Sequence, residues 1–139
     1  MRILCLDYGK KRTGVAVTDP AGLIAQPLQT VETSQLLRFL MDYVNREGVE
    51  RIVMGLPTQP NGQPSDNQPR VRAFAEKLCK ALPQIPVDFY DERFTSVLAH
   101  QAILAAGVKK QRRREDKGLV DEISACIILQ GYMDAQLSH

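Results

Sequence analysis

The stretch RILCLDYGKKRTGVAVTD, residues 2–19, decides the fold expected for this chain. Its first five residues, Arg2 to Leu6, predict a buried strand, because Ile3 to Leu6 form an apolar run that stops at Asp7. A turn region with two glycines follows, and the segment from Thr13 to Thr18 then resumes a β-prone pattern. The pattern predicts a β-hairpin, with Asp7 at the end of its first strand.

Working outward, the chain predicts a third strand and then alternating helices and strands. Strands are expected at Ile24–Val31, Glu50–Gly55 and Val87–Tyr90, and helices at Ser34–Glu47, across Pro69 to Leu82, from Thr95 to about Ala106 and from Leu119 to about Gln136. The expected N-caps are Thr33 or Ser34 for the first helix and Ser65, Asp66 or Asn67 for the second. In the last helix, the residues expected to face inward are Val120, Ile123 and Ile127. Three strands followed by alternation imply an α/β fold with a mixed five-stranded sheet, antiparallel on one side, parallel on the other and flanked by helices.

Composition limits the class of protein. A chain of 139 residues, 44% of them hydrophobic, has the common size of one compact domain, so a single domain over residues 1–139 is expected. We find no apolar run long enough for a signal peptide or a membrane span, which predicts a cytoplasmic protein without a membrane partner. Cys5, Cys79 and Cys126 are widely separated and flanked by apolar residues, so they are interpreted as buried packing thiols.

Three carboxylate positions could carry chemistry. Asp7 ends an apolar strand, where a charge needs compensation; it either organises the hairpin turn or binds a metal ion. Asp91 and Glu92 follow the strand Val87–Tyr90, and because strand side chains alternate, only one of the two is expected to join Asp7. Asp121 lies in the first turn of the expected last helix, where the helix dipole alone would favour a carboxylate.

These acids are expected to meet at one edge of the sheet, because the carboxyl ends of parallel strands cluster there. Several carboxylates in one place repel one another unless cations neutralise them, and hard divalent cations prefer oxygen ligands. Mg²⁺ or Mn²⁺, as a pair of ions, could there activate water and stabilise the leaving oxygen of a phosphodiester.

The basic residues are concentrated, although the net charge is only +2. The segment from 109 to 117 has a net charge of +4, which leaves about −2 for the rest of the chain. It could guide a phosphate backbone to the acids, or it could be a solvated loop. The candidate nucleic-acid-binding residues are Lys109, Lys110, Arg112, Arg113, Arg114 and Lys117 in this loop, Arg93 after the last strand, and Lys10, Lys11 and Arg12 in the first hairpin.

The motifs resemble those of one family. Residues 6–19 resemble the opening motif of the YqgF-type pre-16S rRNA nucleases, which are also described as Holliday-junction-resolvase-like. Residues 53–57, 91–96 and 117–121 resemble the other motifs of that family, in order. The resemblance implies a ribonuclease-H-like fold, a metal-dependent endonuclease that matures the 5′ end of 16S rRNA, and a catalytic and metal-binding triad of Asp7, Glu92 and Asp121. It is the resemblance that selects Glu92 over Asp91.

Other functions remain open at this stage. The same fold could cut branched DNA, or it could bind RNA as a ribosome-assembly factor without cutting it. Asp7 to Gly14 also resembles the phosphate-1 loop of ATP-binding proteins of the actin and hexokinase superfamily, but those close two domains around the nucleotide, and this chain is long enough for one. The sequence is compatible with either a monomer or a homodimer. Resolvases of four-way junctions act as dimers, so the resolvase function would imply a homodimer.

Overall fold

The first hairpin sets the register of the sheet. In the computed structural model, which describes residues 1–57, 65–91 and 117–137, β1 (Arg2–Asp7) pairs antiparallel with β2 (Arg12–Thr18), from Leu4 against Val17 to Asp7 against Gly14. β2 in turn pairs antiparallel with β3 (Ala25–Glu32). The predicted hairpin and third strand are confirmed.

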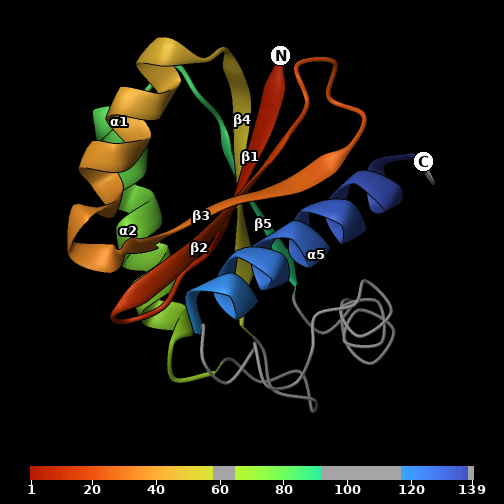
Figure 1. The fold of residues 1–139 in the computed structure, drawn as a ribbon. Coiled ribbons are helices and arrows are strands. Elements are labelled where there is room, and N and C mark those ends of the chain that lie inside the picture. Colours follow the sequence, from red (N-terminus) through yellow and green to blue (C-terminus); the bar gives the residue numbers. More distant parts are fainter. Residues whose placement is uncertain (58–64, 92–116, 138–139) are drawn as a thin grey trace.

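The other side of the sheet is parallel. β4 (Val49–Leu56) runs parallel to β1, and β5 (Val87–Asp91) runs parallel to β4, so the strand order is β3-β2-β1-β4-β5. This is the mixed five-stranded sheet that the order of elements predicted. Its central strands β1 and β4 are apolar because helices cover both of their faces (Figure 1).

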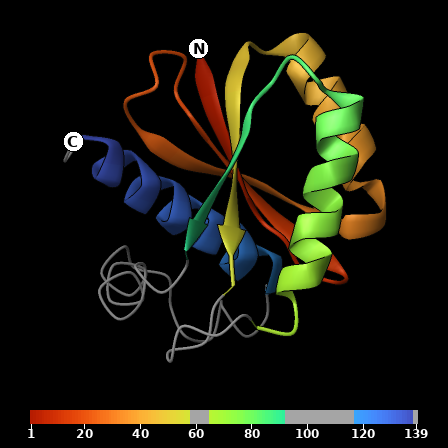
Figure 2. The ribbon, with the colours of Figure 1, turned by 180° about the vertical axis from the view of Figure 1, so that it is seen from behind.

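Helices from different parts of the chain cover the two faces. α1 (Leu36–Arg46), preceded by the short 3-10 helix η1 (Thr33–Gln35), and α2 (Gln68–Ala81) lie together on one face (Figure 1). α5 (Lys117–Leu137) crosses the opposite face, as the view from behind also shows (Figure 2). None of the helices in these three described stretches has the length and apolar character needed to cross a bilayer.

Alternation along the strands divides the core into two layers. Leu4, Leu6, Val15, Ile52 and Met54 belong to the larger layer, under α1 and α2. The smaller layer, under α5, contains the intervening strand residues together with residues of the helix: Cys5, Ala16, Val53, Ala125, Ile128, Leu129 and Tyr132. Because side chains two apart share a face, Asp7 follows Cys5 on the side of the sheet that α5 covers.

Some local predictions were wrong. The N-cap of α1 is Gln35 rather than Thr33 or Ser34, whereas Asn67, one of the residues expected to cap the second helix, is the N-cap of α2. Neither N-cap residue makes a side-chain capping hydrogen bond. The hydroxyl of Thr33 and the side-chain amide of Asn67 donate to carbonyls of the turn after β1. Cys79 is exposed, because it is the outward neighbour of the buried Leu78 on α2.

The last helix also differs from the prediction. It begins at Lys117, two residues early, so Asp121 lies beyond its first turn and the dipole argument for that residue weakens. The buried positions are Ala125, Ile128, Leu129 and Tyr132, whereas Ile123 and Ile127 are only partly buried. The side chain of Val120 and the helix expected from Thr95 to about Ala106 lie outside the described residues.

Candidate active site

Two of the predicted acids lie against the same glycine, Gly14, through their backbones. Asp7, the last residue of β1, has Gly14 of β2 as its Cα partner. A Cβ atom placed on Gly14 would overlap the carbonyl group of Asp121 and would lie 2.8 Å from the backbone nitrogen of Glu122. The backbone of α5 therefore rests directly on the sheet at Gly14, and this contact is what brings Asp121 beside the strand end that carries Asp7.

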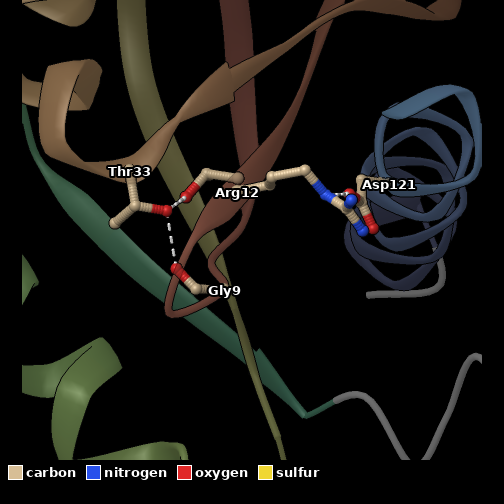
Figure 3. Close-up of polar contacts among 5 residues, drawn as sticks. Gly9, Arg12, Thr33 and Asp121 are labelled. Atoms are coloured by element: carbon tan, nitrogen blue, oxygen red, sulfur yellow. Dashed lines mark hydrogen bonds and ion pairs between the residues drawn. The ribbon is translucent and has the colours of Figure 1, made fainter. Parts of the chain in front are cut away.

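The turn between β1 and β2 is held by side chains from two other elements. The Thr33 hydroxyl donates to the Gly9 carbonyl at 2.6 Å (Figure 3). The backbone amide of Thr33 donates to the Lys11 carbonyl at 2.9 Å. From the start of α2, the Asn67 side chain donates to the Tyr8 carbonyl at 2.9 Å. Buried or half-buried carbonyls need such partners, and these bonds fix the backbone of the turn.

Gly9 is required by the same turn. A Cβ atom on it would overlap the carbonyl oxygen of Arg12, so the chain can reverse direction this tightly only with a glycine here. The turn presents three exposed cations, Lys10, Lys11 and Arg12, next to the strand end with Asp7.

Arg12 makes an ion pair with one of the acids. Its Nε atom donates to Oδ2 of Asp121 at 2.9 Å, and the two side chains are 46% and 26% exposed (Figure 3). The pair links the first residue of β2 to α5. It also places a positive charge against the Asp121 carboxylate.

The remaining predicted site residues lie largely outside the described part of the chain. These are Glu92, Arg93, Lys109, Lys110, Arg112, Arg113 and Arg114, and Lys117 is the first residue of α5. Among the described residues, no three His, Cys, Asp or Glu side chains form a metal-binding group. The two described acids, Asp7 and Asp121, fit a hard divalent cation because their carboxylate oxygens are the donors that such an ion prefers. Asp121 already binds a positively charged group, the Arg12 guanidinium.

A second polar cluster, which sequence reasoning missed, ties the far part of α5 to the sheet. Tyr132 accepts a hydrogen bond from Arg51 of β4 and donates one to Asp88 of β5 at 2.7 Å, and Arg51 and Asp88 form an ion pair at 3.2 Å. Burial raises the pKa of Tyr132, so its hydroxyl stays protonated and can donate. The three residues are distant in sequence, and none of them belongs to a sequence motif that would have predicted the cluster.

The sheet order, the helices on both faces and the acids beside the end of β1 define the class, a ribonuclease-H-like fold. The solved structure of Thermus thermophilus RuvC in complex with a Holliday junction substrate matches with a TM-score of 0.62 at 14% identity, covering 98% of this chain and 96% of that one. A second structure of RuvC from the same organism matches with a TM-score of 0.57. The predicted fold is confirmed.

The sequence comparisons give the family. The RuvX family, described as Holliday junction resolvase, matches residues 1–135. Relatives that carry the name "Putative pre-16S rRNA nuclease" include one from Phocaeicola vulgatus, 58% identical over 97% of this chain and 96% of its own length, and one from Porphyromonas gingivalis, 56% identical over 96% of each. The chain belongs to the RuvX family, and the predicted family resemblance and nuclease class are confirmed.

Proposed function

We propose that this protein is a metal-dependent endonuclease that hydrolyses phosphodiester bonds in the 5′-end maturation of pre-16S rRNA. The substrate is supported by the names of relatives that share more than half of the sequence over nearly the whole chain. The observation that supports the chemistry is that the backbones of Asp7 and Asp121 both lie against Gly14. Such a substrate is found in the cytoplasm, which is the location that the sequence predicts.

The proposed ligands of the ions are Asp7, Glu92 and Asp121. Asp88 and Tyr90 of β5 both contact Tyr132 of α5, so the even-numbered positions of this strand share the face of Asp7. Asp91, the last residue of β5, has the opposite parity, so the alternation disfavours Asp91 as the partner of Asp7. Glu92, which the family resemblance selects, lies outside the described residues. Mg²⁺ or Mn²⁺, as two ions, would supply an activated water and stabilise the leaving oxygen.

The chain itself would hold and orient the nucleic acid. Lys10 and Lys11 are exposed on a turn whose backbone is fixed by three hydrogen bonds, so their positive charge stays beside the acids. Fixed charges of this kind attract a phosphate backbone without reading its sequence. The same role is proposed for Arg12, Arg93, Lys117 and the basic residues from 109 to 114.

A second candidate function is the resolution of four-way DNA junctions. The description of the family and the likeness to RuvC, whose structure holds a Holliday junction substrate, favour it. A resolvase cuts two strands of a junction and would act as a homodimer, whereas an rRNA nuclease could act as a monomer. In either case we propose that residues 1–139 work as one domain.

The test is cleavage of a pre-16S rRNA fragment and of a four-way DNA junction with Mg²⁺ or Mn²⁺. Asp7→Asn is compared with the matched control Asp42→Asn, which removes the same charge from an exposed position of α1 on the other face of the sheet. We expect wild type and the control to cut RNA, and Asp7→Asn to be slower by at least about a hundredfold. Preferred cutting of the junction would favour the resolvase. Tight RNA binding without cleavage by any of the proteins would identify an assembly factor.

A further inference from the structure

We propose that Arg12 is an exchangeable counterion of Asp121, which pairs with this carboxylate until a divalent cation binds and is then released to the phosphate backbone. The inference rests on the proposed function, because it takes Asp121 as a metal ligand. Its consequence is that the ion and the nucleic acid strengthen each other's binding through one side chain.

The geometry supports exchange. The Nε–Oδ2 distance of 2.9 Å is that of a well-formed charged hydrogen bond, yet nearly half of the Arg12 side chain and a quarter of that of Asp121 are exposed. An ion pair open to water is weak, and breaking it leaves both charges in partial contact with water. The pair can therefore neutralise Asp121 and still be displaced.

The backbone of Arg12 is fixed, so the change is confined to its side chain. Arg12 begins β2, and its carbonyl lies directly against Gly9 in the turn that Thr33 holds. Its Cα partner in β3 is another acid, Glu32, but the guanidinium group reaches Asp121 on α5 (Figure 3). The side chain thus extends over the α5 face of the sheet, where the proposed metal ligands lie.

A guanidinium group and a divalent ion cannot share the Asp121 carboxylate at low cost. At about 4 Å their like charges repel strongly at the dielectric of a protein surface. An ion bound by Asp7 and Asp121 would expel the Arg12 side chain. The planar guanidinium group of Arg12 could then bind two phosphate oxygens at once, which a lysine ammonium group does less well. Because such coupling is reciprocal, a phosphate group that binds Arg12 would also strengthen the binding of the divalent ion.

The first measurement is Mn²⁺ binding without nucleic acid, by calorimetry, for wild type, Arg12→Gln, Arg12→Lys, Asp7→Asn and the control Lys77→Gln. Lys77 is exposed on α2, on the opposite face of the sheet, and its substitution removes the same charge. We expect Arg12→Gln to bind Mn²⁺ about two- to fivefold more tightly, because the competing cation is gone. Arg12→Lys, which keeps the charge, and Lys77→Gln should remain near wild type.

A purely structural Arg12, which only holds α5 on the sheet, predicts the opposite sign. Mn²⁺ binding that is weaker or unchanged in Arg12→Gln would overturn the inference, while loss of binding in Asp7→Asn would leave the proposed function intact. Wild type that takes up no Mn²⁺ at all would overturn both. Thermal unfolding of each variant verifies that it is folded.

The second measurement is the affinity for a labelled pre-16S rRNA fragment, in EDTA and in Ca²⁺. We expect Arg12→Gln to weaken RNA binding by about threefold more in Ca²⁺ than in EDTA, where the wild-type side chain is held by Asp121. An equal loss in both conditions would show that Arg12 contacts RNA without any exchange and would refute the coupling.

Discussion

Replacing Gly14 by alanine tests the contact that assembles the site. The added Cβ atom would lie 2.8 Å from the Glu122 nitrogen and would overlap the Asp121 carbonyl, and both are backbone groups that cannot rotate away. We therefore expect α5 to withdraw by on the order of 1 Å, with a loss of about 1–3 kcal/mol of unfolding free energy, as in other overpacked sites. A displacement of this size at reacting groups can slow catalysis by about a hundredfold.

The assays are urea unfolding and cleavage of the pre-16S fragment, with Gly48→Ala as the control. Gly48 is exposed, and a Cβ there would lie 3.4 Å from the flexible end of the Met1 side chain, so no steric cost is expected. Neither glycine has a positive φ; in the described residues, Gly22 is the glycine that does. Gly48→Ala should therefore leave cleavage unchanged and stabilise the fold by about 0.4–1 kcal/mol, which is also what Gly14→Ala would do without its steric contact. A Gly14→Ala protein that is as stable and as active as wild type would refute the reasoning.

Three further substitutions test the supports of the fold. Thr33→Val removes the hydroxyl that holds the first turn and should cost about 0.5–1.5 kcal/mol in urea unfolding, whereas Ser34→Ala, at an exposed neighbour, should cost nothing measurable; equal effects would count against the tie. Tyr132→Phe should cost about 1 kcal/mol and leave cleavage largely intact, because the ion pair beneath it remains; a severe loss of cleavage would show that this cluster also positions the acids. Hydrogen bonds from the amides of the β2–β3 hairpin, that of residue 24 first, lower the pKa of Asp19 below its ordinary value of 3.8, so its contribution to stability is present above pH 3.8 and is lost as the pH falls through the folded-state pKa. Asp19→Ala should remove this acid sensitivity from unfolding curves, and an unchanged pH profile would contradict that role.

The architecture could be predicted because its signals are local. The apolar run that ends at Asp7 and the β-prone segment after it define the hairpin, and the later helices show clear apolar faces, as in α1 with Leu36, Leu40 and Tyr43. Asp7 itself could be singled out because a charge at the end of a buried strand requires a partner. The order of strands and helices then implied the mixed sheet.

The rotation of α5 could not be predicted, because its polar residues, among them Glu122, Gln130 and Asp134, are spread around the helix and its periodicity defines no single apolar face. Its orientation depends on the contact with Gly14, which joins segments more than a hundred residues apart. The first helix cap was predicted wrongly for a related reason. Thr33 has a suitable side chain for capping, but it lies within η1, and its hydroxyl bonds to the Gly9 carbonyl of the first turn.

The order in which the chain is made has a consequence for an enzyme built this way. Arg12 and Asp121 are separated by 109 positions, and Asp7 precedes both. Synthesis on the ribosome proceeds from the N-terminus, so the turn and its lysines emerge long before α5. A nascent chain could hold one acid of the proposed set without the other. A protein that cuts ribosomal RNA would then be inactive while a ribosome is still translating it, and would gain activity only when α5 docks on Gly14.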